Sequence, residues 1–255
     1  MGSRKQDYSV FDKFNFERKP VGVKFLPTQP EGINRLNKEL NFCEMLKEAQ
    51  TSKPFYAGKG DFHCIESLLL GMEDPEPIFV SGLFGAVENL FKEARACRAM
   101  YQYLPRMMKG SVNFVAFAPI DQLPFDPDVL VVTAEVIQAQ TLLRSIGYST
   151  GEFFSSKATP VAMCSWIYIY PVLSGEMNYV VTGLGLGMQA LNVLPPGLFL
   201  ISVPWNKLPT MIDNLKEINI DRTSPPPGGE AHRKRVKQLM EDLRKRMPNG
   251  ERNKH

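Results

Sequence analysis

Cysteine is the residue type in this sequence that could carry the most chemistry. Four cysteines stand far apart, at positions 43, 64, 97 and 164 of 255 residues. Thiolates are ligands for soft metals such as zinc and for iron–sulfur clusters. The sequence contains no C-x-x-C pair, so its spacing predicts no local metal site. The plain alternative is that these thiols are buried and pack as small hydrophobic side chains.

A nucleophilic cysteine is a second option, centred on Cys64. This residue precedes a predicted helix, and a helix N-terminus lowers the pKa of a thiol. His63 is its neighbour in sequence, but adjacent side chains of an extended segment point to opposite faces. We therefore expect neither a Cys–His catalytic pair nor a zinc ion shared by His63 and Cys64.

Polar residues flank a nearly continuous apolar run at 126–134, which is typical of a strand buried on both faces. Asp126 and Asp128 precede it and fit turn chemistry around Pro127. If 129–133 is a central parallel strand, a ligand crevice would form at its carboxyl end, near Glu135 and Gln138. We therefore rank these two residues as candidate pocket residues. The alternative is that both lie on a helix surface.

Aromatic residues could line a pocket for a flat cofactor such as a tetrapyrrole. Trp166, Tyr168 and Tyr170 would share one face of a strand predicted over 160–173, and Phe153 and Phe154 lie upstream. An ordinary sheet core explains the same stripe.

The stretch VTGLGLGMQA places Gly183, Gly185 and Gly187 after a predicted strand. A dinucleotide fingerprint needs its third glycine at the position of Met188, and no Lys-Ser or Lys-Thr follows for a P-loop. We therefore expect no nucleotide. The glycines instead favour close backbone approach, to a packed neighbour or to a bound cofactor.

These residues must be positioned by an α/β fold, in which helices pack on a mixed sheet. Period-two patterns and short apolar runs predict strands at 20–27, 55–57, 111–120, 126–134, 160–173, 177–183 and from 199. Three- and four-residue steps predict helices at 33–50, 65–71, 84–107, 135–148, from 208 and at 230–247. Two segments repeat the order helix, turn and cysteine. This order is compatible with an internal duplication, which has a consequence for function only if it places Cys64 and Cys164 side by side.

Composition shifts predict an N-terminal arm at 1–19, a single α/β domain at 20–221, and a Pro/Gly linker with a basic tail at 222–255. The tail carries a net charge of +6 and the remainder a net charge of −3. A nucleic-acid footprint on the domain is therefore not expected, and only residues 230–247 could supply one.

The sequence also bounds the compartment and the partners. No apolar run reaches the length of a membrane helix, and the first residues lack the apolar core of a secretory signal. Four scattered cysteines favour a reducing compartment, so we expect a cytoplasmic protein without a membrane partner. A small molecule or a redox partner fits such a chain, and a homo-oligomer stays open.

Six segments, in order, resemble a family of unknown function found in archaea and anaerobic bacteria, the ArCR group. They are PVGVKFLP, FCEMLKEA, FYAGKGDFHCIESLLLGM, FDPDVLVVTAEVIQAQTLL, GYSTGE and VAMC, within residues 18–190. The resemblance implies recurring cysteines at Cys43, Cys64 and Cys164, whereas Cys97 falls outside the shared segments. The segment TGLGLGMQ lacks the Arg that family members tend to carry there.

The resemblance and the cysteines together predict a cytoplasmic cofactor- or metal-binding protein, with a redox role as one option. Cys43, Cys64 and Cys164 would form a three-thiolate site for an iron–sulfur cluster or another soft metal, and three thiolates would leave one iron of a cubane open. The alternative is a non-catalytic small-molecule-binding or assembly protein, with an apolar, aromatic-lined pocket and no metal. The sequence does not decide whether the protein is an enzyme.

Overall fold

The computed structural model describes residues 6–218 and 228–246. The chain divides into a body, Met1–Ile218, and a second unit, Asn219–His255. The predicted boundary after residue 221 and most of the predicted linker fall among residues 219–227, outside the described residues.

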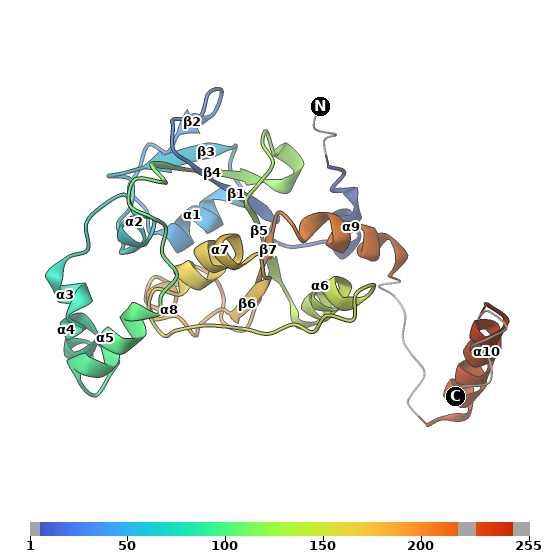
Figure 1. Ribbon diagram of the computed structural model, residues 1–255. Helices are drawn as coiled ribbons and strands as arrows, with labels where there is room; N and C mark the ends of the chain where they lie inside the picture. The colour runs from blue at the N-terminus through green and yellow to red at the C-terminus, as the bar shows by residue number, and fades with distance from the viewer. Residues whose placement is uncertain (1–5, 219–227, 247–255) are drawn as a thin grey trace. The chain divides into compact units, whose positions relative to one another are not determined.

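The body is built on a seven-stranded sheet of order β2-β3-β4-β1-β5-β7-β6 (Figure 1). Its strands are β1 (Val21–Leu26), β2 (Asn34–Arg35), β3 (Phe55–Gly58), β4 (Phe114–Pro119), β5 (Val129–Ala134), β6 (Asn178–Val181) and β7 (Phe199–Pro204). Short β2 pairs with β3 in parallel, and the other neighbours along the sheet pair antiparallel. The predicted mixed α/β class is confirmed.

Strand β5 lies near the middle of the sheet and all six of its residues are buried. Its apolar run follows from that position, because both faces are covered. Val131 lies opposite Val21 of β1 and Ser202 of β7, and both pairings are antiparallel. The premise of a central parallel strand is therefore wrong. The crevice expected at its carboxyl end loses its topological basis.

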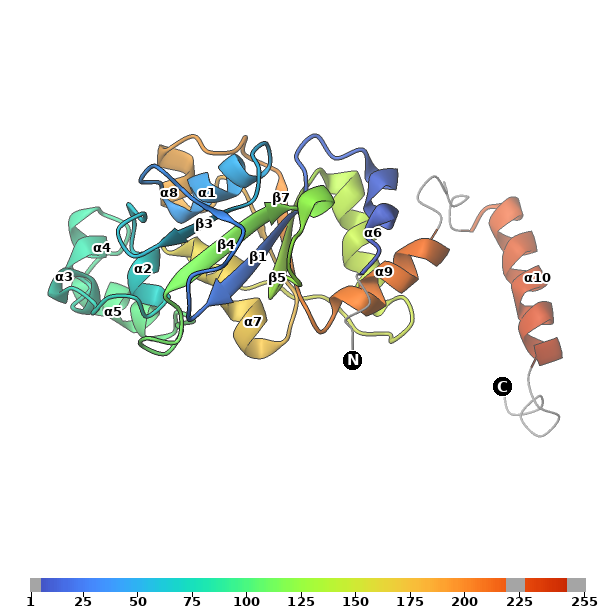
Figure 2. The same ribbon diagram turned by 90° about the horizontal axis from the view of Figure 1, so that it is seen from above.

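Helices cover the sheet on both faces and extend it at one end (Figures 1 and 2). They are α1 (Phe42–Ala49), α2 (Glu66–Leu69), α3 (Pro77–Val80), α4 (Leu83–Val87), α5 (Ala94–Gln102), α6 (Val136–Gly147), α7 (Tyr170–Ser174), α8 (Leu186–Ala190) and α9 (Leu208–Glu217). Two 3-10 turns, η1 (Ser9–Phe14) and η2 (Ile120–Gln122), and one π-helical turn, η3 (Ser165–Ile169), complete the body. Helices α3, α4 and α5 pack on one another at the end of the body away from α9.

The strand predicted over 160–173 is wrong. Residues 165–174 form η3 and α7 instead. Within η3, Ile167, Tyr168 and Ile169 are all almost fully buried, so no polar face remains to reveal a helical period. A segment that is apolar all round cannot be assigned to helix or strand by periodicity alone.

Two predicted helices are shorter in the structure. The helix expected over 33–50 starts only at Phe42, because Asn41 caps it: the Glu44 carboxylate accepts the Asn41 backbone N–H at 2.9 Å. The helix expected over 84–107 is interrupted between α4 and α5, where Asn89 adopts a φ of +54°. That left-handed residue ends the first helix, so a continuous amphipathic pattern spans two short helices.

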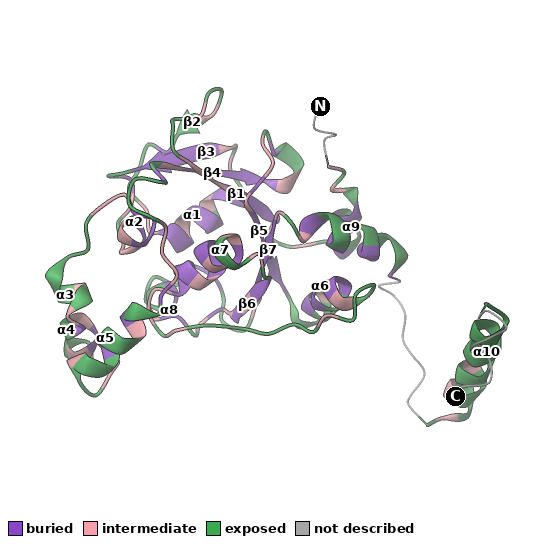
Figure 3. Cartoon of the chain, viewed as in Figure 1, coloured by how far each residue is buried: buried purple, intermediate pink, exposed green. Residues whose placement is uncertain are grey.

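The core between α1, the sheet and η3 centres on Phe42. Its ring lies 4.3 Å from the ring of Tyr168 and 5.5 Å from that of Phe117, measured between centroids. All three side chains are buried. Figure 3 shows that much of the sheet and part of α1 fall in the buried class. This aromatic cluster fixes the start of α1, which carries Cys43, against η3, which Cys164 directly precedes.

In the second unit the structure describes one helix, α10 (Glu230–Arg246), with no buried residue. Val236, Leu239, Met240 and Leu243 form its narrow apolar stripe, and all four are exposed. Residue 247, the last of the predicted tail helix, lies outside the described residues. Over the described part of the chain, no helix is both long enough and apolar enough to cross a membrane.

Candidate functional site

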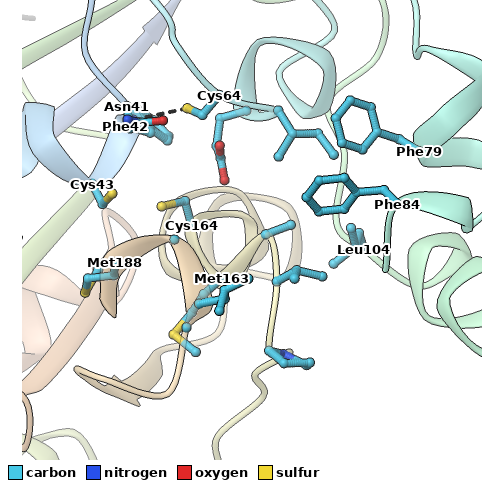
Figure 4. Close-up of a pocket in the computed structure, with 18 of the residues that line it drawn as sticks. Asn41, Phe42, Cys43, Cys64, Phe79, Phe84, Leu104, Met163, Cys164 and Met188 are labelled. Atoms are coloured by element: carbon cyan, nitrogen blue, oxygen red, sulfur yellow. Dashed lines mark hydrogen bonds between the residues drawn. The ribbon is translucent and has the colours of Figure 1, made fainter. Parts of the chain in front are cut away.

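All four cysteines line one cavity of about 320 Å³. Figure 4 shows the sulfur atoms of Cys43, Cys64 and Cys164 at one end of it. Phe79, Phe84 and Leu104 lie toward the other end. The cavity therefore has a thiol end and an apolar end.

Cys43 and Cys64 are brought together by the capped start of α1. Cys43 is the second residue of this helix and is buried. The Phe42 backbone N–H donates a hydrogen bond to the Cys64 sulfur at 3.3 Å. The first turn of a helix leaves backbone N–H groups unpaired, and here one of them is satisfied by a thiol from another segment.

Cys164 reaches the same end of the cavity from the turn before η3. Ala162 adopts a φ of +52°, a conformation that a residue with a side chain rarely takes up. The Ser165 hydroxyl then donates to the Pro105 carbonyl at 2.5 Å, which ties this turn to the segment after α5. Left-handed non-glycine residues and π-helical turns are both enriched at functional sites.

Glu66, the first residue of α2, is the one carboxylate among the residues that line the cavity. It is only 5% exposed. The Cys64 and Cys164 side chains line the same cavity. Among the described residues it takes part in no ion pair. A buried carboxyl group without a cationic partner is costly for the fold.

The local environment disfavours charge on the thiols. Burial, and then the Glu66 carboxylate, raises the pKa of Cys64. The adjacent Cys43 thiol, followed by burial, raises the pKa of Cys164 well above its usual value. Burial also raises the pKa of Glu66, although the hydrogen bonds from the thiols oppose this shift. Cys64 and Cys164 are therefore protonated at neutral pH.

The Tyr168 hydroxyl adds a polar atom beside this group. Burial raises the pKa of Tyr168, and the next contributions come from Cys164, Cys43 and Glu66. The side chain is fully buried, and its hydroxyl has no hydrogen-bond partner among the described residues. Buried polar groups are paired in the great majority of cases, so an unpaired hydroxyl beside three thiols calls for a reason.

The predicted glycines divide between packing and the cavity. Gly183 has a φ of +92°, and a Cβ there would lie 2.9 Å from the Cβ of Pro196. A Cβ at Gly185 would lie 3.2 Å from the Met163 side chain, whereas a Cβ at Gly187 would meet no atom within 4 Å. Gly185 and Gly187 line the cavity.

The other predicted pocket residues lie elsewhere. Gln138 accepts the Glu135 backbone N–H at 2.8 Å at the start of α6, and its side-chain amide donates to the Phe14 carbonyl at 2.9 Å. Trp166 donates from its indole nitrogen to the Thr159 hydroxyl at 2.9 Å. None of these three is among the described residues that line the cavity. The structure gives Glu135 and Gln138 a helix-capping role.

His63 and the paired aspartates also have local roles. The His63 side chain is exposed, with Nδ1 3.6 Å from the Glu39 carboxylate. The Asp128 carboxylate accepts the Phe25 backbone N–H at 2.7 Å, across the turn that leads into β5. His63 also lines the cavity, and its ring lies beside the Glu39 carboxylate.

Sequence reasoning missed Glu66 and the role of Tyr168. Glu66 stands two residues after Cys64, so a Cys-x-Glu pattern was the available signal. Tyr168 was placed on a strand, where its neighbours would have differed. Over residues 6–218 and 228–246, no three or more His, Cys, Asp or Glu side chains are arranged to hold a metal ion.

Two comparisons bear on the family. An uncharacterised protein of Methanocaldococcus jannaschii is 27% identical over 143 residues, which cover 53% of this chain and 60% of that relative. The chain thus spans less than two thirds of the relative's length. No solved structure matches this chain.

A family described as uncharacterised ArCR matches residues 11–214, which include the whole sheet and every residue of the cavity. The chain belongs to the uncharacterised ArCR family.

Proposed function

We propose that this chain is a cofactor-binding protein whose cavity holds a soft metal centre on Cys43, Cys64 and Cys164. The observation that supports it is the convergence of these thiols. They come from α1, from the loop before α2 and from the turn before η3, and they line the same end of one cavity.

Ordinary core packing accounts for this convergence less well. A buried cysteine that acts as a small hydrophobe needs apolar neighbours. Here the cavity that the three cysteines line is also lined by the buried carboxyl group of Glu66. Soft thiolates at one point favour zinc-class ions or an iron–sulfur cluster over hard cations.

Loading such a site requires a change in the side chains. The pKa values of Cys64 and Cys164 are raised, so these thiols hold their protons, and no metal-holding arrangement exists among the described residues. Metal binding replaces thiol protons and releases them to solvent. We expect the three sulfurs to turn about their Cα–Cβ bonds toward a common point, while α1 and η3 stay in place.

Metal analysis of the full chain, purified without oxygen, tests this function. A brown protein that contains iron and sulfide would indicate an iron–sulfur cluster. A colourless protein that contains zinc would indicate a mononuclear site. Serine variants of Cys43, Cys64 or Cys164 should each lose most of the metal. Cys97→Ser is the matched control, because Cys97 lines the same cavity at the face of α5. A wild-type chain that stays metal-free after reconstitution with iron and sulfide or with zinc would overturn the proposal.

A second candidate is an apolar small-molecule site without metal. It is favoured by the other end of the cavity, where Phe79 and Phe84 pack 5.3 Å apart beside Leu104. Such a pocket would bind an apolar fluorescent probe. A Phe84→Ala variant should weaken that binding and the three serine variants should not. The opposite pattern would favour the thiol end.

The free thiols also favour a reducing compartment such as the cytoplasm, since a disulfide framework would be the expectation elsewhere.

A further inference from the structure

We infer that Glu66 supplies the fourth ligand of the centre held by Cys43, Cys64 and Cys164. This inference rests on the proposed function and extends it to a residue that motif reasoning did not select. The fourth ligand would be a carboxylate oxygen from the first residue of α2.

The first argument is placement. Glu66 lines the same cavity as the three cysteines and is only 5% exposed. Glu66 stands two residues after Cys64, so the rotation of side chains that loading requires would bring its carboxylate to the same ion as the sulfurs. Zinc-class ions accept both thiolate sulfur and carboxylate oxygen, usually with four ligands in total.

The second argument is charge. Glu66 is buried at 5% exposure, and no ion pair of the described residues includes it. Buried carboxylates are retained where they are paired or coordinate a metal. The group of three thiols and one carboxylate lacks a positive charge, and a bound divalent cation supplies it.

The third argument is the donors that surround the group. The Phe42 backbone N–H already donates to the Cys64 sulfur at 3.3 Å. The Tyr168 hydroxyl is buried without a partner beside the same residues. Donors of this kind offset the negative charge that remains when three thiolates and a carboxylate bind one divalent ion. Tyr168 would be a positioning residue rather than a ligand.

Titration of the chelator-treated full chain with Co²⁺ alone tests the inference. Cobalt reports thiolate ligands by charge-transfer absorption and the coordination geometry by its visible bands. We expect Glu66→Gln to keep the charge-transfer absorption, to change the visible bands and to weaken Co²⁺ binding by about 10-fold or more. Glu66→Asp keeps the charge on a shorter side chain and should bind with intermediate affinity.

Glu73→Gln is the matched control. Glu73 follows in the same segment, accepts a hydrogen bond from Ser67 at 2.8 Å and lies 3.6 Å from Lys59, away from the cavity lining. Thermal unfolding of each metal-free variant checks that it folds. If Glu66→Gln binds Co²⁺ with wild-type affinity and shows the wild-type visible bands, Glu66 is not a ligand, and the proposed three-thiol site is unaffected. A wild-type chain that binds no Co²⁺ would overturn both proposals.

Discussion

The backbone N–H of Phe42 donates a hydrogen bond to the sulfur of Cys64 at 3.3 Å, which joins the start of α1 to the loop before α2. By itself this bond lowers the pKa of Cys64, but burial and the Glu66 carboxylate outweigh it and raise that pKa. The surroundings of Cys64 therefore do not favour the option of a thiol activated by its position before a helix. Helix α2 has only four residues, and a buried carboxylate lies beside the sulfur.

This balance predicts slow alkylation of Cys64 and Cys164 in the folded, metal-free chain. The thiolate is the reactive form, and both thiols have raised pKa values. With iodoacetamide at pH 8, we expect both cysteines to react roughly tenfold or more slowly than in urea. Mass spectrometry of peptides over time measures each site. Modification of Cys164 at the unfolded rate would contradict the buried, hydrogen-bonded arrangement.

Glu66→Gln should change how the stability of the metal-free chain depends on pH. The pKa of Glu66 is raised from 4.5 in the folded state, so the folded chain holds this proton more tightly than the unfolded chain. The stability due to Glu66 is therefore fully present below pH 4.5 and is lost as the pH rises through the folded-state pKa. The Gln side chain cannot lose a proton. We expect urea unfolding with a chelator present to show that the free energy of unfolding of the variant increases relative to that of the wild type as the pH rises above 4.5. A difference that does not change with pH would contradict the direction of this shift.

The sequence predicted the fold class and the cysteines that meet, but not how they meet. Strand β5 was predictable because a short apolar run between turn residues is typical of a strand that is buried on both faces. Cys43, Cys64 and Cys164 were selected by residue type and family resemblance. Their shared cavity depends on contacts between segments up to about 120 residues apart, which local patterns do not encode.

The residues that sequence reasoning misplaced share a physical cause. Around η3 almost every side chain is buried, so Tyr168 carried no period that distinguishes a helix from a strand. Glu135 and Gln138 were selected from a topology in which β5 would have been parallel to its neighbours. With β5 antiparallel on both sides, their polar groups cap α6.

Gln138→Ala tests that capping role against a binding role. The side chain accepts the Glu135 backbone N–H and donates to the Phe14 carbonyl, so it holds both the start of α6 and the end of η1. We expect a loss of about 1–2 kcal/mol in the free energy of unfolding. Co²⁺ affinity should stay at the wild-type value, since Gln138 does not line the cavity. Normal stability with weakened Co²⁺ binding would instead assign Gln138 to the binding site.

Gly185→Ala should narrow the cavity. The added Cβ would lie 3.2 Å from the Met163 side chain, which lines the cavity and is flexible enough to move into it. We expect severalfold weaker binding of an apolar fluorescent probe. Gly187→Ala adds a methyl at a second lining position without displacing a neighbour, because its Cβ meets no atom within 4 Å, and alanine in α8 should stabilise the fold by up to about 1 kcal/mol. If Gly185→Ala and the wild type bind the probe with equal affinity, the Met163 side chain moves away from the cavity rather than into it.

Tyr168→Phe tests whether the Tyr168 hydroxyl contributes to the stability of the metal-free fold or to metal binding. The hydroxyl has no hydrogen-bond partner among the described residues, so its removal should leave the metal-free chain as stable as the wild type, or up to about 1 kcal/mol more stable. Thr182→Val is the control, because the Thr182 hydroxyl is buried and paired: it donates to the Pro195 carbonyl and accepts the Leu198 N–H. We expect that variant to lose about 1–3 kcal/mol. If Tyr168 donates to a thiolate of the loaded centre, Tyr168→Phe should still weaken Co²⁺ binding. Urea unfolding and Co²⁺ titration of the same preparations measure the two effects separately. A Tyr168→Phe variant that is less stable than the wild type but binds Co²⁺ with unchanged affinity would show that the hydroxyl serves the fold alone.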